Sequence, residues 1–479
     1  MKFQMSDFSF VVPEIFLLSM ACLVLTVDLF VSDRNRIVTY LLAQLSLLGG
    51  LILTLVNFSQ TSDFAFSHTF VKDPMSDVLK MFIFIATSVV FLYAKDYLRE
   101  RGMFKGEFYV LGLFSVLGMM VLVSAANMLT VYLGLELLSL SLYAMVALQR
   151  DSSMASESAM KYFVLGAIAS GMLLYGMSML YGVTGTLELS EIARVASLTS
   201  DKLLLSFGLV FIIVGVAFKL GAVPFHMWIP DVYHGAPTAV TLFIGTAPKI
   251  AAFAMLMRLL VDGLMGLHEH WQTILVILAV LSMGIGNLIA IAQSNIKRML
   301  AYSTISHVGF LMLGVLTGTE NGFAASMFYT LSYVLMSLGG FGMVILLSRR
   351  GFEADKLEDF KGLNERNSWY ALMMMILMFS MAGVPPFLGF WGKLYVLEQV
   401  IAADMVWLAI AGVMFSIIGA FYYLRIIKLM YFDKPDDVQP LVCGLDMRFM
   451  ISANGLAVLL VGLFPGGLMT LCLSALSVS

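Results

Sequence analysis

Fourteen apolar segments, each long enough to cross a lipid bilayer, follow one another through this 479-residue chain. No polar stretch between them is long enough to form a soluble domain. Because a membrane-spanning backbone must satisfy its own hydrogen bonds, the pattern predicts an all-α polytopic membrane protein with 14 transmembrane helices. The segments lie near residues 11–31, 37–57, 75–95, 107–125, 127–148, 158–181, 204–224, 237–261, 272–292, 299–317, 322–347, 369–398, 404–430 and 449–476.

The basic residues are divided unevenly between the two sets of loops. An even number of spans puts both termini on one side, where the loops hold four Lys and Arg residues against sixteen on the opposite side. Since cytoplasmic loops carry the excess of basic residues, we expect both termini to be periplasmic and the loop at 348–368 to be cytoplasmic. That loop mixes both signs of charge, which favours a solvated connector; a docking surface for a partner is the alternative. A net charge of −3 argues against a nucleic-acid partner.

One apolar stretch, residues 215–253, carries two lysines and a helix-breaking sequence. Lys219 lies just before Gly221 and Pro224, which indicates backbone buried in protein or lining a water-filled space. Lys249 lies about 11 residues, or roughly 16 Å at 1.5 Å per residue, from either end of its own segment. Snorkelling to the membrane surface from that depth is strained, so a functional role is favoured over a passive one.

A second broken segment suggests an internal repeat. The seventh span is interrupted at residues 221–225 and the twelfth at residues 383–387, and Lys393 follows the second break. The two spans run in opposite directions in the expected topology, which is typical of inverted-repeat transporters. The residues expected to break the helices are Gly221, Pro224, Gly383, Pro385 and Pro386.

Other ionisable residues lie within or beside the spans. Glu136 is near the middle of the fifth span, where a carboxylate must be protonated or paired. Lys161 begins the sixth span four residues after Glu157, so an interfacial ion pair explains it nearly as well as a function does. His307 is the only histidine well inside a span, and histidine changes charge readily near neutral pH. Since a charge on one buried group disfavours a like charge on the next, such a set can pass protons.

Several polar residues have simpler explanations. His268 and His270 form a weak metal-like pair that we expect to be solvated, and the three cysteines are far apart. We expect no metal site and no bound NAD, flavin, iron–sulfur cluster or haem in this chain. Four basic residues lie close to span ends and are expected to snorkel: Lys80, Arg258, Arg425 and Lys428.

Four motifs are distinctive: FKLGAVPFHMWIPDVYHGAP, NIKRMLAYSTISHVG, LGLELLSL and GVPPFLGFWGK. Together they resemble the antiporter-like subunits of respiratory complex I, which are similar to subunits of multi-subunit cation/proton antiporters. The resemblance extends from the second or third span onward. Within that family the chain is most similar to the N type, because residue 393 is lysine where the M type has glutamate, and because no long lateral helix like that of the L type is seen.

The resemblance implies roles for individual residues. Glu136 matches the glutamate that modulates the lysine of span seven, and Lys219 matches that lysine. Lys249 matches the central connecting lysine, and Lys393 the terminal lysine that faces the outer half-channel. Two further residues match the hydrophilic axis with less defined roles, Lys161 and His307.

The resemblance also implies two inverted five-helix repeats, spans 4–8 and 9–13, with broken helices 7 and 12. The corresponding divisions of the chain are 1–106 for an N-terminal three-helix region, 107–261 and 272–430 for the two repeats, and 431–479 for the last loop and span 14.

The expected function is that of a proton-translocating membrane-arm subunit of an NADH-quinone oxidoreductase in a bacterial inner membrane. An M-type subunit and small subunits such as K and J are the expected neighbours, and NADH, FMN, iron–sulfur clusters and quinone would be bound by partner subunits. A subunit of a cation/proton antiporter and a subunit of a membrane-bound hydrogenase-type complex are the alternatives. A purely structural spacer is disfavoured by the cost of burying so many ionisable groups.

Overall fold

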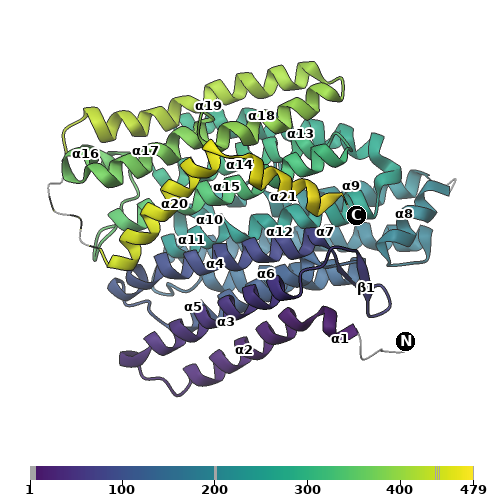
Figure 1. Cartoon of the computed structure of the whole chain (residues 1–479), viewed down its shortest axis with the longest axis horizontal. Coiled ribbons are helices and arrows are strands. Elements are labelled where there is room, and N and C mark those ends of the chain that lie inside the picture. Colours follow the sequence, from purple (N-terminus) through teal and green to yellow (C-terminus); the bar gives the residue numbers. More distant parts are fainter. Residues whose placement is uncertain (1–6, 199–201, 437–438, 440, 442, 478–479) are drawn as a thin grey trace.

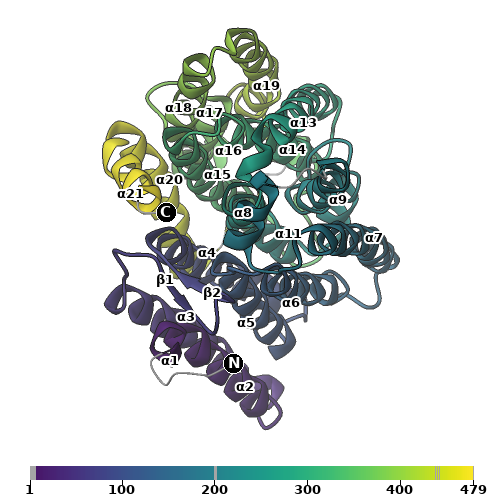
Figure 2. The same cartoon turned by 90° about the vertical axis from the view of Figure 1, so that its right-hand side faces the viewer.

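The computed structural model describes residues 7–198, 202–436, 439, 441 and 443–477. The chain forms an elongated bundle of helices that run roughly along one direction (Figure 1). Among the described residues, 11 helices are long and apolar enough to cross a membrane. Viewed along the helices, α2 and α3 lie at one edge of the bundle and α18 and α19 at the other, with α11 and α15 between them (Figure 2).

The helices have the following bounds. The first half of the chain contains α1 (Asp7–Phe10), α2 (Val12–Asp28), α3 (Ile37–Val56), α4 (Pro74–Glu100), α5 (Gly106–Val123), α6 (Met128–Val146), α7 (Ser153–Thr184), α8 (Leu189–Leu198), α9 (Lys202–Leu220), α10 (Trp228–Gly235), α11 (Thr238–Ile244) and α12 (Ala247–Leu256). The second half contains α13 (His268–Ile291), α14 (Ile296–Val315), α15 (Glu320–Leu347), α16 (Leu363–Arg366), α17 (Ser368–Ala382), α18 (Leu388–Ala402), α19 (Val406–Phe432), α20 (Leu445–Leu463) and α21 (Gly466–Leu476).

Short irregular elements connect the helices. Two three-residue antiparallel strands, β1 (Asp63–Ala65) and β2 (Phe70–Lys72), form a small hairpin between α3 and α4. The hairpin lies at the same end of the bundle as α1, α8 and the end of α21 (Figure 1). The described ends of the chain therefore lie on one side of the bundle.

The structure differs in three places from the fourteen predicted segments. The first segment forms α2, which has only 17 residues. The tenth forms α14, whose sequence includes Lys297, Arg298 and His307 and is correspondingly polar. The twelfth is divided into α17 and α18, each of 15 residues. Each of these three segments is helical but too short or too polar to be among the 11 long apolar helices, so the count of fourteen spans stays a prediction.

Two helices are interrupted where the sequence places glycine and proline. The chain leaves α9 through Gly221, which has φ +84°, and leaves α17 through Gly383, which has φ +87°. A side chain at Gly221 would also place its Cβ 1.9 Å from Ile229 Cδ1. A side chain is strained in that left-handed region, so glycine allows both breaks. Because α9 follows α8 and α17 follows α16, at opposite ends of the bundle, the two helices run in opposite directions (Figure 1).

Two helix pairs, α5 with α6 and α13 with α14, make close backbone contacts. A Cβ at Gly118 would lie 2.5 Å from the amide nitrogen of Leu138, and a Cβ at Gly286 would lie 2.7 Å from that of Ser306. Small residues permit such close helix crossings in membranes. The second helix of each pair carries an ionisable residue of interest, Glu136 on α6 and His307 on α14.

Two of the four residues expected to snorkel are instead buried in ion pairs. Lys80 Nζ lies 2.7 Å from Glu14 Oε1 of α2, and the two side chains are only 1% and 8% exposed. Arg258 contacts Asp73 at 2.8 Å and Asp262 at 2.9 Å. The prediction was wrong because the acidic partners Glu14 and Asp73 lie on other segments, and sequence position alone does not reveal such pairs. Burial is tolerated here because each charge has an opposite charge in contact.

Candidate proton-transfer site

Lys249 lies against the broken end of α9. Its Nζ donates a hydrogen bond to the carbonyl oxygen of Leu220, the last residue of that helix, at 2.8 Å. Its Nζ also lies 5.5 Å from the centre of the Trp228 ring. The partial negative charge at a helix C-terminus and the face of an aromatic ring both favour a cation. The break in α9 thus provides a buried binding place for the ammonium group of Lys249.

Lys393 has the same relation to the broken end of α17. Its Nζ donates hydrogen bonds to the carbonyl oxygens of Met381 at 3.2 Å and Ala382 at 2.9 Å. The third acceptor is Ser416 Oγ of α19, at 2.8 Å. An ammonium group has three N–H donors, and these three acceptors use all of them. Lys393 therefore contacts the broken end of α17 in the same way that Lys249 contacts the broken end of α9.

Lys219 and Glu136 face the same small cavity but are not in contact as an ion pair in the part of the chain that the structure describes. Lys219 Nζ donates to Ser139 Oγ at 2.9 Å. Ser170 Oγ of α7 donates to Glu136 Oε1. Lys219 lies near enough to interact electrostatically with both Glu136 and Lys249. The structure thus brings the acid and two of the three deep lysines together.

His307 is buried between two tyrosine hydroxyls. Its Nδ1 lies 2.6 Å from Tyr329 Oη of α15, and its Nε2 lies 3.0 Å from Tyr423 Oη of α19. His307 also interacts electrostatically with Lys393. Both ring nitrogens of His307 therefore have a hydrogen-bond partner. His307 lies in the same part of the bundle as Lys393.

Lys161 lies apart from these residues. Its side chain is 44% exposed and forms ion pairs with Glu157 at 2.8 Å and Asp231 at 2.9 Å. Asp231, at the start of α10, also contacts Arg298 at 3.0 Å. The sequence prediction included the pair with Glu157 but missed Asp231, which is distant in sequence.

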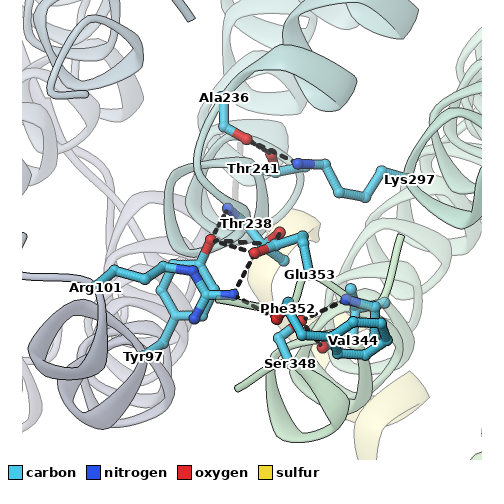
Figure 3. A network of polar contacts seen from close by, with 11 residues as sticks. Tyr97, Arg101, Ala236, Thr238, Thr241, Lys297, Val344, Ser348, Phe352 and Glu353 are labelled. Atoms are coloured by element: carbon cyan, nitrogen blue, oxygen red, sulfur yellow. Dashed lines mark hydrogen bonds and ion pairs between the residues drawn. The ribbon is translucent and has the colours of Figure 1, made fainter. Parts of the chain in front are cut away.

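A polar network holds part of the 348–368 loop against the bundle (Figure 3). Glu353 accepts hydrogen bonds from Tyr97 Oη at 3.1 Å, from Arg101 and from the hydroxyl of Thr238. This end of the loop is therefore packed against α4 and α11, whereas the charge pattern favoured a solvated connector. A cavity of about 700 Å³ lies beside the network and is also lined by Lys297.

The hydroxyl partners were not predicted from the sequence. Ser139, Ser170, Ser416 and the two tyrosines lie in apolar helices, and sequence position does not show which residue on another helix each hydroxyl contacts. The sequence did indicate one of these partners, because Ser139 follows Glu136 by three residues and must share its helical face. Among the described residues, no group of three or more His, Cys, Asp or Glu side chains is placed to hold a metal ion.

Comparison with known proteins agrees with this fold. Residues 125–419 match the family described as "NADH:quinone oxidoreductase/Mrp antiporter, TM". The chain is 60% identical to NADH-quinone oxidoreductase subunit N of Thioalkalivibrio sulfidiphilus, with all of both chains covered. It is also 60% identical to the subunit N of Thiobacillus denitrificans, over 100% of this chain and 99% of that relative.

A solved structure also matches the fold of this chain. A chain of respiratory complex I from Thermus thermophilus with bound aureothin is 30% identical, with a TM-score of 0.83 over 97% of this chain and 100% of that chain. The fold and site thus define an antiporter-like membrane subunit. More particularly, the chain belongs to the family of NADH-quinone oxidoreductase N subunits.

Proposed function

We propose that the chain transfers protons across the membrane as one subunit of the membrane arm of an NADH-quinone oxidoreductase. The observation that carries this proposal is the burial of three lysines next to two broken helices, in a chain whose relatives are N subunits. Oxidation of NADH and reduction of quinone take place on partner subunits, which bind NADH, FMN, iron–sulfur clusters and quinone. The chain itself contributes the groups that hold and release protons.

The contacts suggest a role for each group. Glu136 adjusts the charge of Lys219 by electrostatic attraction, since the two interact without an ion-pair contact. Lys249, held at the end of α9, connects Lys219 to the second half of the chain. His307 and Lys393 continue the path, and Lys393 releases the proton towards the outer side. Lys161, exposed and doubly paired, is better explained as an interfacial ion-pair residue, and we assign it no step.

We further propose that the 14 helical segments all span the membrane as two inverted five-helix repeats. The opposite directions of α9 and α17 support this, as does the similar contact of Lys249 and Lys393 with a helix end. The proposed units are the three-helix region at 1–106, the repeats at 107–261 and 272–430, and the last loop and span at 431–479.

The membrane is the inner membrane of a bacterium, with both termini periplasmic. The neighbours are an M-type subunit and small subunits such as K and J, within the lipid bilayer. A cation/proton antiporter subunit is the second candidate, because the family description includes it. The relatives at 60% identity favour the oxidoreductase. Copurification of this chain with subunits that carry flavin and iron–sulfur clusters would exclude the antiporter.

The function is tested by proton pumping of the complete complex in proteoliposomes. Lys249→Met and Lys393→Met should each reduce NADH-driven proton uptake by about tenfold or more, because each removes a carrier. Lys428→Met is the matched control, since Lys428 lies on α19 with a side chain that is 68% exposed. Normal pumping by both assembled carrier variants would contradict the proposed function.

A further inference from the structure

Lys219 and Glu136 are each hydrogen-bonded to a serine hydroxyl, Lys219 to Ser139 and Glu136 to Ser170. Ser139 and Glu136 lie three residues apart on one face of α6, and Ser170 lies opposite them on α7. Ser139 Oγ receives the hydrogen bond of Lys219, and Ser170 Oγ donates to Glu136. Glu136 and Lys219 each have a hydroxyl as a neighbour where a direct salt bridge could otherwise form.

We propose that Ser139 and Ser170 are positioning residues, which hold the acid and the lysine near each other and prevent a permanent ion pair. The proposal rests on the proposed function and specifies how its first proton carrier is controlled. A buried contact ion pair would stabilise the ammonium form of Lys219 and the carboxylate form of Glu136 together. A lysine fixed in that way could no longer release its proton in each cycle.

A hydroxyl suits this role because it is both a donor and an acceptor of hydrogen bonds. Ser139 accepts a bond from the ammonium form of Lys219, and after a small rotation it can donate to the lone pair of the neutral amine. Ser170 donates to a carboxylate and can accept from a protonated carboxyl group. Each serine can therefore keep its partner in place in both protonation states, which a charged partner or a carbonyl group cannot do.

The surroundings leave little room for other partners. Lys219 and Glu136 both line a cavity of about 20 Å³, together with Tyr143 and Gly166. That volume is sufficient for about one water molecule. Among the described residues, the ionisable neighbours of this site include Tyr143 on α6, Tyr162 on α7 and Lys249 on α12. Ser170 Oγ also lies 3.4 Å from Tyr132 Oη.

The test compares serine variants of the intact complex in proteoliposomes. Ser139→Ala should reduce NADH-driven proton pumping by about tenfold, the factor that corresponds to one hydrogen bond, while Ser139→Thr, which keeps the hydroxyl, should restore most of it. The double variant Ser139→Ala with Ser170→Ala should be little worse than Ser139→Ala alone, because the two hydroxyls prevent the same event. Ser141→Ala is the matched control, since Ser141 Oγ donates to Leu137 O of its own helix at 2.8 Å.

Pumping by assembled Ser139→Ala complexes at the Ser141→Ala level would overturn the proposal. Equal loss in Ser139→Ala and Ser139→Thr would also overturn it, because the loss would then reflect packing. Lys219→Arg in the same assay separates this failure from failure of the proposed function. If Lys219→Arg is inactive and Ser139→Ala is normal, only the positioning role fails; if Lys219→Arg pumps normally, the proton-transfer role of Lys219 fails as well.

Discussion

The buried ion pair of Lys80 and Glu14 joins α2 to α4, and the distance between the two charges sets the strength of their attraction. At the observed 2.7 Å separation, an effective dielectric constant of about 20 gives roughly 6 kcal/mol of attraction before the cost of desolvation is subtracted. Removing one partner leaves the other charge buried without its contact partner, which typically costs about 3–5 kcal/mol. Lys80→Met and Glu14→Leu should therefore each destabilise the attachment of α2.

The double variant distinguishes a buried ion pair from a snorkelling lysine. Because two apolar side chains in contact need no charge compensation, Glu14→Leu combined with Lys80→Met should recover most of the lost stability. The measurement is the thermal midpoint of the purified complex, with Lys428→Met as the control for an exposed pair worth at most about 1 kcal/mol. Single variants as stable as the control, or a double variant as unstable as the sum of the two, would refute the argument.

Three further predictions concern the site and the topology. Glu136→Asp should keep more proton pumping than Glu136→Gln or Glu136→Ala, because the role needs a negative charge; full pumping by the alanine variant would remove Glu136 from the mechanism. Gly383→Ala should reduce proton pumping and should lower the stability of the complex by about 1 kcal/mol or more. The reason is that residue 383 has φ +87° and that the new Cβ would lie 2.9 Å from Lys393 Cδ. A variant with wild-type stability and pumping would show that the helix break does not need glycine. In a cysteine-free background, a cysteine replacing exposed Glu358 should react only from the cytoplasm and one replacing exposed Ser190 only from the periplasm; the reverse pattern would invert the topology.

The sequence predicted the positions of the deep lysines and of the helix breaks for a physical reason. Glycine and proline within long apolar runs, and lysines far from either end, are costly in a bilayer and are readily noticed. The structure places Lys249 and Lys393 at those breaks. The family of the chain was likewise predicted from the motifs around Glu136 and Lys219, and the comparisons confirm it.

The partners of these residues could not be predicted in the same way. Ser139 and Ser141 are two residues apart in one apolar helix, but only Ser139 faces a lysine, while Ser141 bonds to its own helix. The pair of Lys80 and Glu14 depends on how α2 packs against α4, which periodicity does not reveal. The amphipathic helix α8 was also missed, because its ten residues are too few and too polar to resemble a span.

The central claim is that Lys219 must both gain and lose a proton. A lysine that serves only as an electrostatic partner of Glu136 could be replaced by arginine, which keeps the positive charge. A proton carrier could not, because a guanidinium group stays protonated at any accessible pH. A buried lysine amine can become neutral, since low dielectric and neighbouring charges destabilise its ammonium form.

The decisive measurement is NADH-driven acidification of inverted membrane vesicles that contain the assembled Lys219→Arg complex. The matched control is Lys202→Arg, at the exposed first residue of the same helix. We predict that the control pumps normally, whereas Lys219→Arg loses pumping and also reduces quinone more slowly, because the two processes are coupled. Normal pumping by an assembled Lys219→Arg complex would contradict this account and would leave Lys249 and Lys393 as the carriers.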